Sequence, residues 1–259
     1  MSVPLSLVRL RPDLPVLARW GLGRGYLSRH GDADFGYVLH AALRDGLGRL
    51  APRPFVLRSI QGGSRDDELL GYVRATPDEM KEAAALPPVN GSAKALSLPA
   101  MEARAMPERW RAGAQYSFEV RVRPIVRTRR GGRATPEKRA EVDEVDAAAW
   151  AAHRVRDDTG TVPSREEVYR GWLAARMESR GAHLIGARLI AMRRTRVRRR
   201  PQFNGERRTR DIEGPDVLFR GELSVSDGER FAEGMARGVG RHTAFGFGCL
   251  LLAPPGAWS

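Results

Sequence analysis

The sequence predicts an α+β fold made of two tandem ferredoxin-like (RRM-like) domains, each with the element order β-α-β-β-α-β. Three observations support this prediction. The chain has 259 residues, which is enough for two domains of about 100–150 residues each. Segments that alternate apolar and polar residues recur in both halves, and the helical segments occupy the same places among them. We therefore expect an N-terminal domain over residues 1–110 and a C-terminal domain over residues 111–259.

The N-terminal half begins with an expected strand, VPLSLVRL, followed by a Gly- and Pro-rich segment that reads as a loop, PDLPVLARWGLGRGYLSRHGD. The next segment, DADFGYVLHAALRDGL, is expected to be a helix with Asp32 or Asp34 as its N-cap. Two expected strands follow, PFVLRSI and ELLGYVRA. A second helix starts at Thr76, because Thr76 and Glu79 have the spacing of a capping box. The expected last strand is AKALSLP.

The C-terminal half repeats this order. A long strand is expected over QYSFEVRVRPIVR, and a helical patch around EKRAEVDEVDAAAWAA. A stronger helix runs over PSREEVYRGWLAARMESRG, because Ser164 and Glu167 form a capping box and Gly181 ends the helix. The remaining elements are the strands AHLIGARLIAMRRTRV and PDVLFRGELSVS, the short helix DGERFAEGMARG and the final strand FGCLLLAP.

The formal net charge of +13 favours an anionic partner, either nucleic acid or an anionic membrane. Residues 188–210 contain ten arginines and one acid, and residues 121–133 contain six arginines and no acid. A solvated protein face usually interleaves the two signs of charge. Two blocks of one sign are more typical of a surface that binds phosphates.

Composition excludes several classes of protein. No segment approaches the roughly 20 apolar residues that span a bilayer, and the first residues carry prolines and charges where a signal peptide needs an apolar run, so we expect a cytoplasmic protein. The single cysteine, Cys249, excludes an internal disulfide and a multi-thiolate metal site, and it reads as a buried, inert thiol. No pair among the five histidines has the spacing of a metal-binding helix motif, so no metal and no cofactor are expected.

A glycine-rich segment, GVGRHTAFGFGCLLLAPPG, precedes the final strand, with glycines at Gly238, Gly240, Gly246 and Gly248. It follows a helix and opens a strand, which is the reverse of a dinucleotide-binding fingerprint. Backbone amides in such a loop can bind phosphate, but a tight helix-to-strand connection needs glycines equally. Both interpretations stay open on the residues alone.

The first expected helix carries a candidate proton-transfer group, His40. At about 100° per residue, Tyr37, His40 and Arg44 share the polar side of this helix, opposite Val38, Leu39 and Leu43. A histidine between a phenol and a guanidinium can move a proton and stabilise charge on a phosphate. The alternative is an ordinary surface histidine on an amphipathic helix.

Several of these segments together resemble one family. YVLHAAL on the first helix, the arginine-rich strand after a capped helix, the segment GPDVLFRGELSVSD, and the closing GVGRHTAFGFGCLLLAP resemble the CasE-type CRISPR repeat-processing endoribonucleases, the crRNA-maturing subunits of type I Cascade. The resemblance runs from the first strand to the last. It also implies two tandem ferredoxin-like domains.

The resemblance implies metal-independent cleavage of CRISPR repeat RNA at the base of its stem-loop, by attack of a 2′-hydroxyl. The products would carry a cyclic phosphate or 3′-phosphate and a 5′-hydroxyl. It makes His40 the general acid or base and gives Tyr37 a role in positioning the 2′-hydroxyl or the phosphate. A second pair, Tyr26 and His30, lies in a long insertion before the helix, and His30 could take the role of His40. The implied partners are the crRNA hairpin and the other Cascade subunits, with target DNA contacted only through the complex.

Residues expected to bind RNA come from both arginine blocks, the first helix and the glycine-rich loop. They are Arg44, Arg127, Arg129, Arg130, Arg193, Arg194, Arg196, Arg198, Arg199, Arg200, Arg241 and His242, with Gly238, Gly240, Gly246 and Gly248 shaping the surface. A stem would be held largely through its phosphates, since duplex RNA hides its sequence in a narrow major groove.

Two other functions stay open. A related protein could hold an RNA hairpin and scaffold other subunits without cutting efficiently. A general RNA-binding protein with paired RRM-like folds would use stacking aromatics on its central strands, for which Tyr116 and Phe118 are the candidates. A membrane-surface role is not expected, because the arginine block lacks an apolar helical face.

Overall fold

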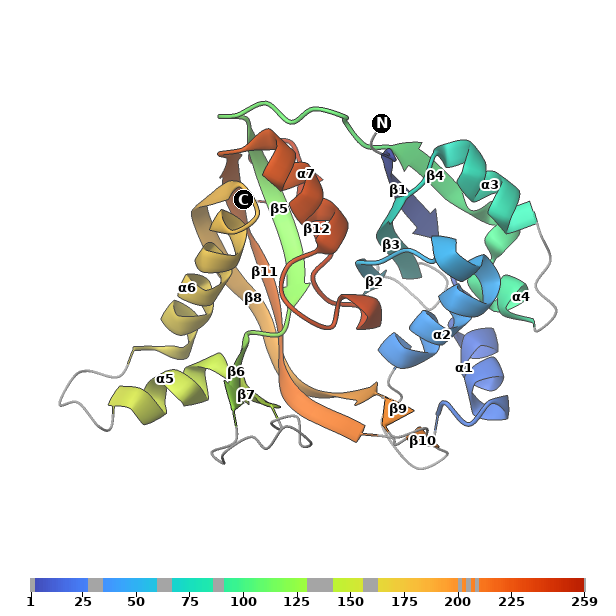
Figure 1. Ribbon diagram of the computed structural model, residues 1–259, viewed down its shortest axis with the longest axis horizontal. Helices are drawn as coiled ribbons and strands as arrows, with labels where there is room; N and C mark the ends of the chain where they lie inside the picture. The colour runs from blue at the N-terminus through green and yellow to red at the C-terminus, as the bar shows by residue number, and fades with distance from the viewer. Residues whose placement is uncertain are drawn as a thin grey trace.

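Two four-stranded antiparallel sheets organise the computed structural model of the chain (Figure 1). The structure describes residues 3–27, 35–59, 67–85, 91–129, 142–155, 163–199, 202–203, 206–207 and 210–258. In both sheets the strands follow the order 4-1-3-2 within a β-α-β-β-α-β unit, with the fourth strand beside the first. The predicted α+β class with two ferredoxin-like units is therefore confirmed.

The N-terminal sheet has the order β2-β3-β1-β4. Its strands are β1 (Leu5–Leu10), β2 (Phe55–Ser59), β3 (Asp67–Arg74) and β4 (Glu102–Ala105). One face carries the helices α1 (Leu14–Gly23), α2 (Phe35–Leu47), α3 (Pro77–Ala85) and α4 (Ser92–Leu96), with single turns of 3₁₀ helix at η1 (Gly48–Leu50) and η2 (Leu98–Ala100).

The C-terminal sheet has the order β12-β5-β11-β8. Its strands are β5 (Gln115–Val122), β8 (Ala182–Arg199), β11 (Arg210–Val225) and β12 (Leu250–Ala253). Helices α6 (Arg165–Glu178) and α7 (Gly228–Arg237) cover one face. The remaining elements are the hairpin of β6 (Ile125–Arg129) and β7 (Val142–Asp146), helix α5 (Ala147–Val155), the short strands β9 (Gln202–Phe203) and β10 (Glu206–Arg207), and the 3₁₀ turn η3 (Thr243–Phe245).

The N-terminal sheet is buried on both faces. Val8 and Leu69 face the helices, whereas Leu70 and Tyr72 on the opposite face pack against the core of the C-terminal sheet. The Tyr72 hydroxyl donates a 2.8 Å hydrogen bond to the carbonyl oxygen of Leu250 in β12, and its burial raises the pKa of this phenol. The two sheets are thus joined by a buried interface that contains a polar contact.

Two segments of the N-terminal half differ from their predictions. The expected loop contains helix α1, because Asp13 caps it by accepting a 2.9 Å hydrogen bond from the amide of Val16, and Pro15 fits the first turn. The expected strand AKALSLP instead contains the end of α4, built from good helix formers, and the start of η2. Helix α4 lies between left-handed residues at Gly91 and Ser97. The fourth strand is instead β4.

Two segments of the C-terminal half also differ. The long first strand stops before Pro124, which has no amide hydrogen to continue the ladder, and the chain after it forms β6. Within the expected helical patch, Val142–Asp146 forms β7, paired with β6, and only the alanine-rich part beyond it forms α5. Residues 137–141 of this patch lie outside the described residues. By contrast, α6 has the predicted capping box at Ser164 and Glu167.

Candidate active site and nucleic-acid interface

Helix α2 presents the predicted polar face. Its apolar side, with Val38, Leu39 and Leu43, is fully buried against the N-terminal core. Tyr37 and His40 lie on the other side and are partly buried, and Arg44 one turn later is exposed. The spacing of apolar residues therefore fixes which side of α2 faces away from its own sheet.

The glycine-rich loop runs from the end of α7 to β12 and lies between the C-terminal sheet and α2 (Figure 1). All four predicted glycines have positive φ, between 74° and 86°. A side chain at Gly248 would collide with the carbonyl oxygen of Val239, and a Cβ at Gly240 would lie 2.7 Å from the Trp172 ring. These glycines are required by the path of the backbone, which supports the interpretation as a tight connection.

The loop places Phe245 against the polar face of α2. The Phe245 ring is nearly parallel to Tyr37, with centroids 6.3 Å apart, and it meets the His40 ring edge-on at 5.3 Å. Tyr26 packs against the other side of Tyr37 at 5.4 Å. A residue about 200 positions away in sequence thus fixes the setting of both catalytic candidates. The alternative base, His30, lies outside the described residues.

His40 has a perturbed electrostatic environment. Burial of the ring, together with the positive charges of Arg44 and Arg53, lowers the pKa of His40 below its ordinary value of 6.5. Arg53 follows η1 and donates a 3.1 Å hydrogen bond from Nε to the hydroxyl of Thr243 in the glycine-rich loop. His40 is therefore neutral at pH 7 and can accept a proton, while two guanidinium groups nearby can stabilise an anion.

A buried carboxylate anchors the loop to the β6–β7 hairpin. Glu144 accepts a 2.8 Å hydrogen bond from Nε of Arg241 and lies 2.7 Å from Nε2 of His242. The side chain of His242 is 0% exposed. The structure therefore contradicts the prediction that His242 contacts RNA, because its ring is enclosed and bonded inside the protein. Arg241 is partly exposed and, with Arg53 and Arg237, lines a polar pocket of about 500 Å³ beside the loop.

The face of the C-terminal sheet beside the loop is basic. Arg121 donates two 2.7 Å hydrogen bonds to Asp216, and Arg193 donates another of 2.8 Å. Burial alone would raise the pKa of Asp216, but these bonds outweigh it and hold the pKa below the usual value. The Arg121 guanidinium also lies 4.5 Å from the centre of the Phe247 ring. One carboxylate thus holds two guanidinium groups, which leaves this surface positively charged.

The arginine-rich arm, formed by β8 and β11, carries acidic as well as basic side chains, whereas a surface with positive charge alone was expected. Strand β11 lies antiparallel to β8 and brings Glu213 and Asp211 opposite its arginines. Arg194 and Arg196 bond to Glu213, and Arg198 bonds to Asp211. Because these pairs are exposed, they hold the guanidinium groups only weakly, and a phosphate could replace the carboxylates.

Some of the other predicted arginines are exposed, and the rest lie at positions whose side chains the structure does not describe. Arg127 is exposed on β6, and Arg193 and Arg196 are 68% and 75% exposed. Arg130 and Arg200 lie outside the described residues, and the side chains of Arg129 and Arg199 are not described.

Sequence reasoning missed Phe245, Arg53 and Glu144. Phe245 and Glu144 lie far from α2 in sequence, Arg53 follows α2 closely, and no local pattern distinguished any of the three. The RRM-like candidates do not form a stacking surface, because Phe118 is fully buried in the core and Tyr116 packs edge-on against Trp110.

Within the described residues, no three His, Cys, Asp or Glu side chains gather as a metal site would need, and no helix is long and apolar enough to cross a membrane.

Several proteins of known structure share this fold. The CRISPR endoribonuclease Cse3 bound to a 19-nucleotide RNA is 20% identical, with a TM-score of 0.61 over 97% of this chain and 100% of that one. Thermus thermophilus Cse3 bound to an RNA representing a pre-cleavage complex is 17% identical, with a TM-score of 0.57 over 97% and 100%. A chain of a CRISPR RNA-guided surveillance complex in a pre-nicking state is 20% identical, with a TM-score of 0.50 over 96% and 99%.

At these identities the likeness is one of fold. No curated protein matches the chain by sequence. A family model described as CRISPR associated protein, however, matches residues 6–254, which is nearly the whole chain. This chain belongs to the CRISPR-associated protein family.

Proposed function

We propose that this protein is an endoribonuclease that cleaves CRISPR precursor RNA at the base of the repeat stem-loop without a metal ion. The observation that carries the proposal is the contact of Tyr37 and His40 with Phe245, within reach of the positive charges of Arg44 and Arg53. The fold is that of two RNA-bound Cse3 structures, which supports RNA as the substrate.

In the proposed reaction, neutral His40 accepts the proton of the 2′-hydroxyl upstream of the scissile phosphate. The 2′-oxygen attacks phosphorus, the bond from phosphorus to the 5′-oxygen breaks, and the leaving oxygen takes up a proton. The products are a 2′,3′-cyclic phosphate and a 5′-hydroxyl. Tyr37 positions the 2′-hydroxyl or the phosphate, and Arg44 and Arg53 stabilise the charge that builds up on the phosphate oxygens.

The arm formed by β8 and β11 is proposed to hold the RNA stem. It carries Arg193, Arg194, Arg196 and Arg198 on an 18-residue strand, which at about 3.3 Å per residue reaches about 60 Å. Arg127 on β6 and Arg241 beside the loop extend the basic surface. Because its arginines already lie beside exposed carboxylates, phosphate contacts would replace weak ion pairs.

The test is cleavage of a stem-loop repeat RNA from the same genome, in EDTA, by the wild type and by His40→Ala. The wild type should cut once at the stem base. His40→Ala should bind equally and cut about 10²–10⁴-fold more slowly, which is the usual effect of removing a general acid or base. His183→Ala serves as the matched control, because His183 is exposed on β8 away from α2.

Other outcomes distinguish the alternatives. Tight binding without cleavage by the wild type would favour a scaffold that holds the crRNA hairpin for a surveillance complex. Equal cleavage by the wild type and His40→Ala would refute the role of His40 and make His30 the next residue to test. Cleavage that EDTA abolishes would refute the metal-independent mechanism.

A further inference from the structure

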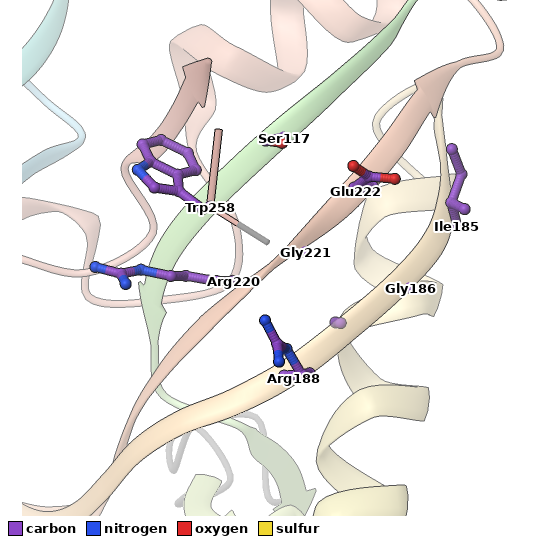
Figure 2. A pocket seen from close by; sticks show the side chains of 9 residues that line it. Ser117, Ile185, Gly186, Arg188, Arg220, Gly221, Glu222 and Trp258 are labelled. Carbon is purple, nitrogen blue, oxygen red and sulfur yellow. The ribbon is translucent and has the colours of Figure 1, made fainter. Parts of the chain in front are cut away.

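A second pocket lies on the exposed face of the C-terminal sheet, apart from Tyr37 and His40. It has a volume of about 240 Å³ and is formed by β5, β8, β11 and the C-terminal segment. Figure 2 shows Trp258, Arg188 and Glu222 around the position of Gly221. None of the residues predicted from sequence to bind RNA lies in it.

The C-terminal segment builds one wall of this pocket. The chain turns at Gly256, whose amide donates a 3.2 Å hydrogen bond to the carboxylate of Glu222. Beyond the turn, Trp258 packs partly against the core of the C-terminal half and stays partly exposed. A large aromatic ring therefore lines a mainly apolar pocket that charged side chains border.

Charged side chains of both signs surround the pocket. Arg220 donates a 2.7 Å hydrogen bond to Glu119, which also binds Arg58 at 3.1 Å, and Arg58 in turn binds Glu68 at 3.3 Å. Glu222 lines the pocket and accepts the amide of Gly256. In the described part of the chain, no carboxylate forms an ion pair with Arg188, so this guanidinium is the group that an anion can approach.

The floor of the pocket consists of small residues. The strands approach so closely at Gly221 that a side chain there would collide with the carbonyl oxygen of Gly186. A Cβ at Gly186, however, would meet no atom within 4 Å, so the space above this residue is open. Ser117 and Ala187 also line the pocket, so no large side chain fills this part of it.

The pocket shares one face of the sheet with the candidate active site. Arg121 lies opposite Leu218 on β11, and Glu222 in the pocket is four residues further along the same strand. At about 3.3 Å per residue this separation is about 13 Å. Arg220 lines the pocket and shares Glu119 with Arg58, so ion-paired side chains border the pocket on this face.

We infer that this pocket binds an unpaired nucleotide of the RNA, with its base stacked on Trp258 and its phosphate paired with Arg188. Tryptophan beside arginine is the combination that single-strand-binding surfaces use, because every base can stack and every phosphate can pair. The volume lies below the range of about 300–1,000 Å³ of drug-sized sites, which suits one base and excludes a duplex. The inference deepens the proposed function and rests on it in taking RNA as the ligand.

The test uses two variants that change the pocket in opposite ways. Trp258→Ala removes the stacking ring, and Gly186→Leu adds a side chain at a lining position where a Cβ meets no atom within 4 Å. Gly171→Leu is the matched control, since a Cβ at this exposed position on α6 also meets no atom within 4 Å. Binding is measured at one salt concentration with two probes, a short oligouridylate and a blunt-ended stem-loop repeat RNA.

We expect both pocket variants to bind the oligouridylate about tenfold more weakly than the wild type, within the range reported for loss of one stacked base. Both should bind the blunt stem-loop as the wild type does, which also shows that they are folded. The control should match the wild type with both probes. Unchanged oligouridylate binding by the two pocket variants, or no binding by the wild type, would overturn the inference.

The experiments distinguish a failure of the proposed ribonuclease function from a failure of the proposed nucleotide pocket. If the wild type neither binds nor cuts the stem-loop while both pocket variants lose oligouridylate binding, the proposed function fails and the nucleotide pocket stands. A 5-iodouridine oligonucleotide gives a second measurement, because it should cross-link to the peptide that contains Trp258 in the wild type. Loss of this cross-link in Gly186→Leu supports the inference, and its absence in the wild type contradicts it.

Discussion

Replacement of Glu144 by alanine tests whether the glycine-rich loop is held by one buried carboxylate. The Glu144 side chain is only 7% exposed, and it bonds to His242, which is 0% exposed, and to Arg241, which is 39% exposed. A buried hydrogen bond to a charged group contributes about 1.5–3 kcal/mol. The more exposed pair with Arg241 adds about 0–1 kcal/mol. We therefore expect Glu144→Ala to lower the free energy of unfolding by about 2–4 kcal/mol.

Urea denaturation of the wild type and the variant measures this difference, and a thermal scan should show a melting temperature lower by about 4–16 °C. Glu166→Ala is the control, because Glu166 forms an exposed pair with Arg170 one turn along α6 and should change stability by less than about 0.5 kcal/mol. His242→Ala, alone and combined with Glu144→Ala, completes a double-mutant cycle.

This reasoning is refuted if Glu144→Ala lowers the free energy of unfolding by no more than Glu166→Ala does. A double-mutant cycle with no coupling between Glu144 and His242 would refute it equally. Because the loop also carries Phe245, the variant should cleave RNA more slowly although Glu144 has no contact with His40 among the interactions described above.

Two further predictions concern charge. Arg53→Ala removes a cation that disfavours the protonated ring of His40, so the pKa of His40 should rise. The acid limb of the pH–rate profile should therefore move to higher pH than in the wild type, and a limb that stays in place would show that Arg53 does not act on His40. Arg196→Ala should weaken stem-loop binding and reduce the slope of log K against log salt by about one, as measured by titrations at several salt concentrations, and an unchanged slope would exclude a phosphate contact there.

The sequence was most informative where structure depends on neighbours along the chain. The capping box at Ser164 and Glu167 marked the start of α6, because both partners lie within one helical turn. The sequence also predicted which side of α2 is buried, because a helical period of 3.6 residues places Tyr37 and His40 opposite the buried leucines. These local rules were enough for α6 and for the polar side of α2, but not for α1, α4 or β7.

The sequence was least informative where partners are far apart. Arg53 and Thr243 are 190 residues apart, and Arg241 and Glu144 are 97 apart, so no periodicity relates them. The arginine block was read as one-signed because the acids that pair with it lie on the next strand of the sheet. Glycine spacing could not separate a phosphate cradle from a tight connection, because both need positive φ.

The position of Phe245 has a consequence for the protein while it is being made. Helix α2 leaves the ribosome before the loop that carries Phe245, and about 200 residues must be added between them. At a rate of about 5–20 residues per second, this interval is about 10–40 s. Throughout it, Tyr37 and His40 lack the ring that fixes their setting, and Tyr72 lacks its acceptor on Leu250. The arginine-rich residues 188–210 are also made only near the end of this interval. The proposed active site can therefore assemble only after the last strand of the C-terminal sheet, β12, has been made and paired.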